Sequence, residues 1–253
     1  MAKPRRSLLD LPLVALPLSA LLWVADVLIV IAWTPAVALF RLVTRRSDPN
    51  RDRAGRLLRN SAAFAVRINP FWDFRVFDDV HPDARRPYLF VSNHKSLADV
   101  FLLTLLPWEM KFLSKDSVFK IPLLGWQMRM AGDIAVERGD KESARKALEE
   151  MRRRLLDKSS VVVFPEGTRG APGALGKFRE GAFRLAIELG VDIVPLAIRG
   201  TETALPKHSL MFRTTQASVT VLPPVSTAGL SAADAPALAE RVRGRIAAAL
   251  GVE

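Results

Sequence analysis

One histidine and one aspartate stand close enough in the chain to act as a base and the group that orients it. His94 and Asp99 lie five residues apart in VSNHKSLAD. On one continuous helix their side chains would diverge by about 140°, because each residue turns about 100°. They can meet if His94 precedes a helix and Asp99 lies in its first turn. We therefore expect a strand over Tyr88–Val91, a helix from about Leu97 to Leu106, and an imidazole with one nitrogen free to take a proton.

The same segment has a simpler interpretation. Ser96 and Asp99 have the spacing of a helix capping box, in which side chains satisfy the first backbone N–H groups of a helix. His94 would then be an ordinary polar residue. The segment alone leaves both interpretations open.

The hexapeptide FPEGTR, residues Phe164–Arg169, directly follows a run of three valines and so lies at the carboxyl end of an expected strand. Ligands of open α/β sheets bind at this end. Gly167 allows close backbone approach, Thr168 offers a hydroxyl, and Arg169 carries a planar donor fork suited to phosphate. Glu166 would hold a basic residue or accept a hydrogen bond from a substrate hydroxyl. An ordinary turn with an exposed arginine is the simpler alternative.

Basic and apolar residues follow one another in KDSVFKIPLLGW, which begins at Lys115. Lys115 is a candidate contact for an anion. Ile121, Pro122 and Gly125 belong to an apolar stretch that could guide an acyl chain. Packing in the core is the simpler interpretation of this apolar part.

Short apolar runs alternate with amphipathic segments through the rest of the chain, which is typical of an α/β domain whose helices cover a sheet. We therefore predict a central mixed sheet flanked by helices. The other expected strands are Lys111–Leu113, Ser160–Phe164, Asp192–Ile198 and an edge strand at Val219–Leu222 that two prolines stop. The other expected helices are Lys141–Lys158, Phe178–Leu189 and Ser231–Leu250, the last with Ser231 as N-cap and Asp234 in its first turn.

The segment Leu8–Leu42 is largely apolar and long enough for one membrane-crossing helix, which needs roughly 20 residues. Basic residues flank both ends, so a single crossing would place one cluster on the trans side, against the positive-inside tendency. A monotopic hairpin would keep both clusters on the anionic cytoplasmic face of the inner membrane. Pro12, Pro17 and Pro35 would supply its breaks. We favour the hairpin over a single span, and over a cleaved signal peptide, for which the apolar region is too long.

Three regions follow from these patterns. Residues 1–46 form the membrane-anchoring helical segment, 47–80 a basic linker and the entry to the core, and 81–253 the catalytic domain. The basic stretch Arg45–Arg59 (RRSDPNRDRAGRLLR) spans the boundary between the first two regions and could touch lipid phosphates or simply form a solvated charged face.

The chain of 253 residues has a net charge of +11 and no cysteine. The charge favours anionic partners such as nucleic acid, anionic lipid or CoA-type ligands, and no nucleic-acid-binding motif is present. The three histidines lack metal-ligand spacing, so no metal site is expected. No G-x-S-x-G elbow exists for a serine hydrolase. A basic, non-enzymatic membrane-binding protein remains as an alternative.

Taken together and in this order, the segments resemble the glycerolipid acyltransferase family, typified by 1-acylglycerol-3-phosphate acyltransferase. The resemblance covers roughly Tyr88–Gly200, and its small departures include Lys95, where glutamine is common. The motifs are N-H-x-x-x-x-D at Asn93, His94 and Asp99; a basic residue before I-P-x-x-G at Lys115, Ile121, Pro122 and Gly125, with a later arginine at Arg138; F-P-E-G-T-R at Phe164–Arg169; and V-P-[VL]-A-I at Val194–Ile198.

The resemblance implies transfer of a fatty acyl group from acyl-CoA or acyl carrier protein to the free hydroxyl of a lysophospholipid, with no further cofactor. Lysophosphatidate is the expected acceptor, and lyso-ornithine lipid, other lysophospholipids and glycerol-3-phosphate are alternatives. His94 would be the general base that Asp99 orients, with oxyanion donors among the backbone amides near the start of the following helix. The expected phosphate site comprises Lys115, Arg138, Glu166, Gly167, Thr168 and Arg169. Ile121, Pro122, Gly125, Val194 and Pro195 would contact the acyl chain or support the fold.

Overall fold

A seven-stranded mixed sheet lies at the centre of the protein in the order β1-β7-β6-β2-β5-β3-β4. The computed structural model describes residues 8–78, 80–169, 174–206 and 209–252. The five strands from β6 to β4 run parallel, β7 runs antiparallel to β6, and β1 pairs in parallel with β7. The strands are β1 (Trp72–Phe77), β2 (Leu89–Ser92), β3 (Met110–Lys115), β4 (Ile134–Val136), β5 (Ser160–Val163), β6 (Ile193–Arg199) and β7 (Thr215–Val221).

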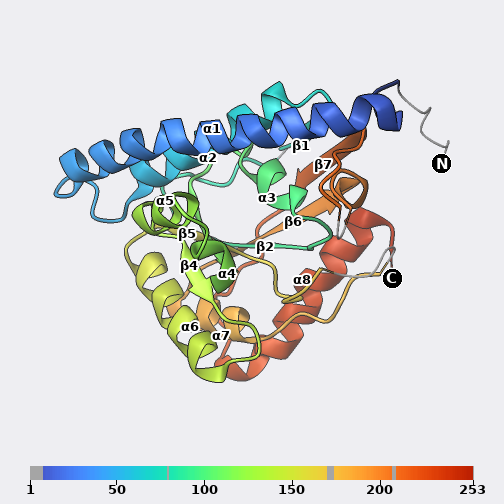
Figure 1. Ribbon diagram of the computed structural model, residues 1–253. Coiled ribbons are helices and arrows are strands. Elements are labelled where there is room, and N and C mark those ends of the chain that lie inside the picture. The colour runs from blue at the N-terminus through green and yellow to red at the C-terminus, as the bar shows by residue number, and fades with distance from the viewer. Residues whose placement is uncertain (1–7, 79, 170–173, 207–208, 253) are drawn as a thin grey trace.

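Helices cover both faces of this sheet, as Figure 1 shows. Side chains from α6, α7 and α8 pack on one face, against Leu89, Val161 and Ile193. The other face, with Phe90, Val162 and Val194, packs under α3. The predicted mixed sheet flanked by helices is therefore confirmed. The helices are η1 (Leu8–Asp10), α1 (Pro12–Thr44), α2 (Asp52–Ile68), α3 (Ala98–Leu103), α4 (Asp116–Phe119), α5 (Leu124–Ala131), α6 (Lys141–Leu156), α7 (Gly181–Leu189), η2 (Thr201–Thr203), η3 (Ala232–Asp234) and α8 (Ala235–Leu250).

The central strands follow the expected ranges closely. Every residue of β2 and β5 is buried, as in parallel strands covered on both faces. Ser231 is the N-cap, as predicted, and it forms a reciprocal capping box with Asp234 ahead of α8. One expectation about the sheet was wrong: β7, expected at an edge, lies inside the sheet. The edge position belongs to β1, whose residues Trp72–Phe77 pair along β7.

The apolar N-terminal segment is one continuous helix, so the predicted two-segment hairpin was wrong in its path. α1 extends over 33 residues, with Pro17 and Pro35 inside it. Packing against α2 and α5 supports it: Trp33 stacks on Phe64 of α2, and Gln127 of α5 donates to the Val30 carbonyl. A proline removes one backbone hydrogen bond, and tertiary contacts of this kind can offset its cost.

α1 keeps much of its apolar surface uncovered. Leu13 is 92% exposed and Leu21 is 63% exposed. The helix is long and apolar enough to cross a membrane, and only 22% of its most apolar stretch is buried. In Figure 1 it lies lengthwise along one side of the domain, next to α2. α1 is therefore a candidate membrane anchor. It lies along the body of the protein and leaves much of its apolar surface exposed.

The basic segment expected as a linker contains a helix. α2 begins at Asp52 because the carboxylate of Asp48 accepts hydrogen bonds from the N–H groups of Asp52 (2.9 Å) and Arg53 (3.0 Å). Within α2, Gly55 lies so close to Glu109 that a Cβ atom there would fall 1.9 Å from its Oε1. The helix thus packs tightly on the domain near the start of β3.

Candidate active site

His94 and Asp99 meet at the carboxyl end of β2. Their Nδ1 and Oδ2 atoms lie 2.7 Å apart, and their side chains are 10% and 0% exposed. β2 ends at Ser92 and α3 begins at Ala98, so the histidine precedes the helix and the aspartate lies in its first turn. The structure therefore has the predicted strand, loop and helix around the pair, although α3 is shorter than expected.

Asp99 also fixes the loop that carries the histidine. Its Oδ2 accepts hydrogen bonds from the backbone N–H groups of Lys95 (2.7 Å) and Ser96 (2.9 Å), while Ser96 Oγ accepts from the N–H of Ala98. The capping arrangement and the contact with the imidazole thus occur together. Since one carboxylate oxygen takes all three hydrogen bonds, the orientation of the imidazole is coupled to the loop.

The expected oxyanion donors are largely occupied. The N–H groups of Lys95 and Ser96 donate to Asp99, and that of Ala98 donates to Ser96. The N–H of His94 donates to Glu166 at 2.9 Å. An amide that already donates inside the protein is not free to stabilise an oxyanion. These four amides are therefore occupied, and Leu97 carries the only amide of residues 94–98 without such a partner in the described chain.

The ring of His94 stacks on Phe164 at 4.3 Å between centroids, with 26° between the planes. No described residue forms a hydrogen bond with its Nε2 atom. With Nδ1 held by Asp99 and one face held by Phe164, the imidazole has a fixed orientation and a free nitrogen. This arrangement can accept a proton from a hydroxyl placed beside Nε2.

Asn93 links the histidine loop to the neighbouring strand. Its side-chain amide donates to the carbonyl of Ile198 and accepts from the N–H of the same residue, both at 2.8 Å. It is fully buried. Asn93 therefore extends the pairing of β2 with β6 by one residue and fixes the point where the chain leaves the sheet.

Glu166 supports the backbone, which the sequence did not indicate. Its Oε1 accepts from the N–H of His94 at 2.9 Å, and its Oε2 accepts from the N–H of Gly176 at 3.0 Å. Arg243 of α8 donates from Nε to the carbonyl of Gly176 (3.3 Å) and from Nη2 to that of Leu175 (3.1 Å). A chain of hydrogen bonds thus connects α8 with the histidine loop. Among the described residues Glu166 forms no ion pair with a basic residue, and its two oxygens accept from backbone N–H groups instead.

Basic residues also gather at the carboxyl ends of these strands. Partial removal from water and the nearby charges of Arg179 and Arg169 lower the pKa of Arg138. The guanidinium of Arg179 lies over Gly167, where a Cβ atom would fall 2.7 Å from its Cζ. Gly167 also has a φ of 73°, a region that favours glycine. The sequence motifs do not indicate Arg179, although it directly follows Phe178 in a segment that the family resemblance covers.

Lys115 ends β3, opposite Val136 of β4. Moving across the sheet from β2, the strands are β5, β3 and β4, and neighbours lie about 4.8 Å apart. Lys115 therefore leaves the sheet roughly 10 Å from the strand that carries His94, and Arg138 follows the end of β4. Lys115 and Arg138 are exposed, as is Thr168, whereas Arg169 is half-buried.

The I-P-x-x-G segment forms a tight turn between α4 and α5. Gly125 is required there, since a Cβ atom would lie 2.0 Å from the carbonyl oxygen of Phe119. Leu123 has φ 63° and ψ −55°, and the N–H of Leu124 donates to the carbonyl of Pro122 at 2.7 Å. Ile121 is 48% exposed. The segment thus presents apolar surface to solvent, as a contact for an acyl chain requires.

Val194 and Pro195 lie inside the sheet instead. They occupy β6 opposite Phe90 and Val91 of β2, and both are buried. Val194 packs in the apolar cluster beneath α3. Their position supports the fold and leaves no surface for an acyl chain. Among the described residues no group of histidine and carboxylate side chains could hold a metal ion.

The fold and the site define a class: a mixed α/β protein in which a histidine–aspartate pair and several arginines meet at the carboxyl ends of parallel strands. The solved structure of the 1-acyl-sn-glycerophosphate (LPA) acyltransferase PlsC from Thermotoga maritima has this fold. It matches with a TM-score of 0.73 over 94% of this chain and 97% of that chain, at 22% sequence identity.

The chain belongs to the acyltransferase family, whose profile, described as Acyltransferase, matches residues 74–199. A chloroplastic 1-acyl-sn-glycerol-3-phosphate acyltransferase from Arabidopsis thaliana is 34% identical over 184 residues, which cover 72% of this chain and 49% of the relative. The human 1-acyl-sn-glycerol-3-phosphate acyltransferase alpha is 36% identical over 165 residues, or 64% of this chain and 58% of the relative. The chain thus spans about half the length of the relatives it matches. The resemblance inferred from the four motifs is confirmed.

Proposed function

We propose that the protein transfers a fatty acyl group from a thioester to the free hydroxyl of 1-acyl-glycerol-3-phosphate, which gives phosphatidate. The contact between His94 Nδ1 and Asp99 Oδ2 at 2.7 Å carries the proposal, because it leaves Nε2 as an oriented base. The names of the relatives support this acceptor. Acyl-CoA or acyl carrier protein would be the donor, and no other cofactor is needed.

The reaction is direct and needs no covalent enzyme intermediate. His94 Nε2 takes the proton of the acceptor hydroxyl as its oxygen attacks the thioester carbonyl carbon. The C–S bond then breaks, and the imidazolium returns its proton to the departing thiolate. The products are an ester and a free thiol, and the histidine is regenerated. Asp99 holds the imidazole during this cycle and stabilises its charged form.

The acceptor phosphate would bind to the basic group at the ends of β3, β4 and β5. Lys115 and Arg138 reach it from two of these strands, and Arg169 from the FPEGTR loop, with Gly167 allowing close approach. Arg179 joins this set, since its guanidinium lies over Gly167. Arginine forks suit phosphate oxygens because they can donate two parallel hydrogen bonds. The exposed Ile121 and Pro122 would receive the acyl chain.

The site would act at a membrane surface. The exposed apolar face of α1 supports a monotopic attachment in which the helix lies along the bilayer, and the basic net charge suits the anionic cytoplasmic face. Such an attachment places a site that acts on lysophospholipids next to its substrates.

The acceptor is tested with one acyl-CoA and a panel of lysophosphatidate, lyso-ornithine lipid, other lysophospholipids and glycerol-3-phosphate, with products identified by mass spectrometry. We expect phosphatidate as the dominant product. Arg169→Ala should raise the KM for lysophosphatidate about tenfold or more while kcat changes less, since a lost charged hydrogen bond costs roughly 1.5–3 kcal/mol. An unchanged acceptor KM would remove Arg169 from the phosphate site.

A further inference from the structure

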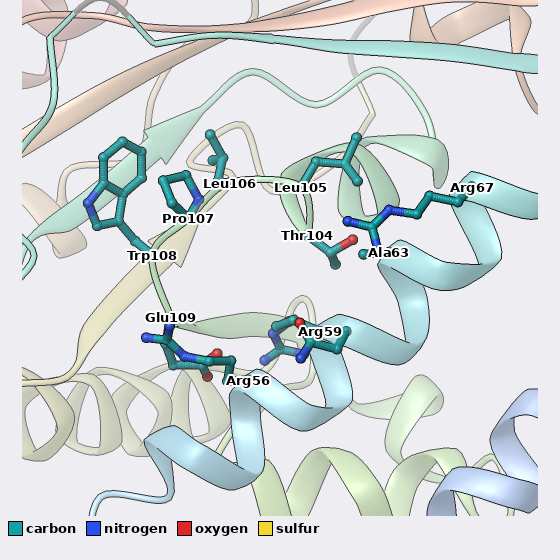
Figure 2. A pocket seen from close by; sticks show the side chains of 11 residues that line it. Arg56, Arg59, Ala63, Arg67, Thr104, Leu105, Leu106, Pro107, Trp108 and Glu109 are labelled. Atoms are coloured by element: carbon teal, nitrogen blue, oxygen red, sulfur yellow. The ribbon is translucent and has the colours of Figure 1, made fainter.

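A basic cavity lies beside α2, away from the His94 site. Its volume is about 340 Å³, and its lining includes Arg56, Arg59 and Arg67 of α2 and, across the groove, Trp108 and Glu109. Figure 2 shows the arginines along the helix and the Thr104–Glu109 segment opposite them. This segment leads into the first residue of β3, whereas His94 follows the carboxyl end of β2. The two sites therefore lie at opposite ends of the parallel strands.

The floor of the groove holds two buried polar groups that have a free atom. Arg59 is ion-paired with Asp133 and lies over the ring of Phe112, but its Nε has no partner among the described residues. Glu109 accepts from Lys111 at 3.2 Å through Oε1, and its Oε2 has no partner there. The Glu109 side chain is 6% exposed. A buried donor and a buried acceptor without partners indicate room for a polar ligand.

The balance of charge in the groove is positive. Arg59 is offset by Asp133 and Lys111 by Asp52, which lies 2.9 Å from its Nζ, while burial raises the pKa of Glu109 to about 7. Arg56 and Arg67 are exposed, and neither forms an ion pair or a side-chain hydrogen bond within the described chain. The two arginines stand three helical turns apart, so each end of the groove offers a free guanidinium. Such a groove attracts anions and presents forks suited to phosphate.

The groove adjoins the apolar surface of α1. On α2, positions 56, 60 and 67 share one face, and Phe64 and Ile68 lie on the neighbouring face. Phe64 is 42% and Ile68 is 38% exposed, and Phe64 stacks on Trp33 of α1 at 6.0 Å. Apolar surface therefore continues from α1 across α2 to the rim of the groove. A bilayer that receives the apolar face of α1 would place its headgroups beside Arg56 and Arg67.

We infer that this groove binds the phosphate of an anionic phospholipid headgroup in the membrane on which α1 rests. Arg56 and Arg67 contact phosphate oxygens, Arg59 donates from the floor, and Glu109 can bond a headgroup hydroxyl. The inference rests on the membrane attachment in the proposed function and not on acyl transfer. The groove would hold the enzyme on an anionic membrane in one orientation.

The test uses the full chain and vesicles of phosphatidylcholine with or without phosphatidylglycerol, with binding measured by flotation. The double variant Arg56→Ala, Arg67→Ala should lose about 30-fold in affinity for vesicles with phosphatidylglycerol, or about fivefold for each arginine. The control is Arg241→Ala with Arg245→Ala, which removes the same charge from exposed positions of α8. It should change the affinity less than twofold.

Two results would overturn the inference. An equal loss in both double variants would show that only net charge matters. Inorganic phosphate that binds the chain as tightly as monomeric dihexanoyl phosphatidylglycerol, with both lost in the Arg56, Arg67 variant, would assign the groove to a soluble anion. Thermal unfolding checks that all variants are folded. Because vesicle binding requires no acyl transfer, the outcome is independent of whether the chain acts on lysophosphatidate.

Discussion

The carboxylate of Glu166 accepts a hydrogen bond from the backbone N–H of His94 at 2.9 Å. The two residues are 72 positions apart in the chain. This contact joins the loop after β5 to the loop after β2, so the FPEGTR segment holds the base in place in addition to any contact with phosphate. Glu166 thus positions the histidine through its backbone.

Glu166→Gln should reduce kcat about 10- to 100-fold with a smaller change in the KM for the acceptor. A glutamine side chain has one acceptor oxygen, so it cannot accept from both His94 and Gly176 as the carboxylate does. A displacement of about 1 Å in a reacting group can cost about 100-fold in rate. Steady-state kinetics separates the two parameters. A change confined to KM would return Glu166 to the substrate site.

Arg243→Ala should reduce kcat about tenfold. Arg243 donates to the carbonyls of Leu175 and Gly176, and Gly176 in turn holds Glu166. Loss of the arginine would loosen this chain of contacts. Arg245→Ala, on the same helix, is the matched control, because its side chain donates only to the Pro223 carbonyl among the described residues. Equal activity of the two variants would exclude a role for α8 in positioning the site.

Gly125→Ala should destabilise the protein by about 2 kcal/mol or more, since the added Cβ would lie 2.0 Å from the carbonyl oxygen of Phe119. Gly244 in α8 is the control, because a Cβ atom there meets nothing within 4 Å. Gly244→Ala should stabilise the helix by about 0.5–1 kcal/mol. Denaturant unfolding of both variants checks the contrast. Equal stabilities would show that the turn can move away from Phe119.

Glu109 should make stability depend on pH. Burial raises its pKa from 4.5 to about 7 in the folded protein. The folded state then holds the proton more tightly than the unfolded state, so this stability is present below pH 4.5 and is lost as the pH rises through 7. The loss amounts to roughly 3 kcal/mol. Glu109→Gln should therefore raise Tm more at pH 8 than at pH 5.

The control for Glu109 is Glu149→Gln on α6, where the glutamate side chain is 72% exposed. Its Tm difference from the parent should be similar at the two pH values. If the difference for Glu109→Gln were also the same at both values, Glu109 would be ionised throughout, held by Lys111 and Arg59.

Local sequence patterns were enough to predict the strands and helices next to the site. The three valines of β5 placed the FPEGTR segment at the end of a strand. The spacing of His94 and Asp99 placed the histidine after a strand and the aspartate in the first turn of a helix, because burial and helical geometry act within a few residues. The path of α1 required more than local pattern. Pro17 and Pro35 suggested breaks, yet contacts with α2 and α5 keep the helix continuous.

Contacts between distant segments could not be predicted from one sequence. The place of β7 inside the sheet depends on pairing with β1, more than 130 residues earlier in the chain. The positions of Glu166 and Arg179 depend in the same way on how two loops pack over Gly167 and Gly176. Residue type and spacing predicted that His94 and Asp99 meet after a strand, whereas the place of Arg179 and the contacts of Glu166 emerged only from the fold.

The central claim is that the His94–Asp99 pair deprotonates the acceptor hydroxyl. The most direct measurement is phosphatidate formation by purified His94→Ala and Asp99→Asn, with lysophosphatidate, acyl-CoA and vesicle binding as the check on membrane attachment. We expect both variants to bind vesicles as the parent does. Formation of product should fall by about 100- to 10,000-fold in each. A His94→Ala variant that retains the activity of the parent would contradict the account.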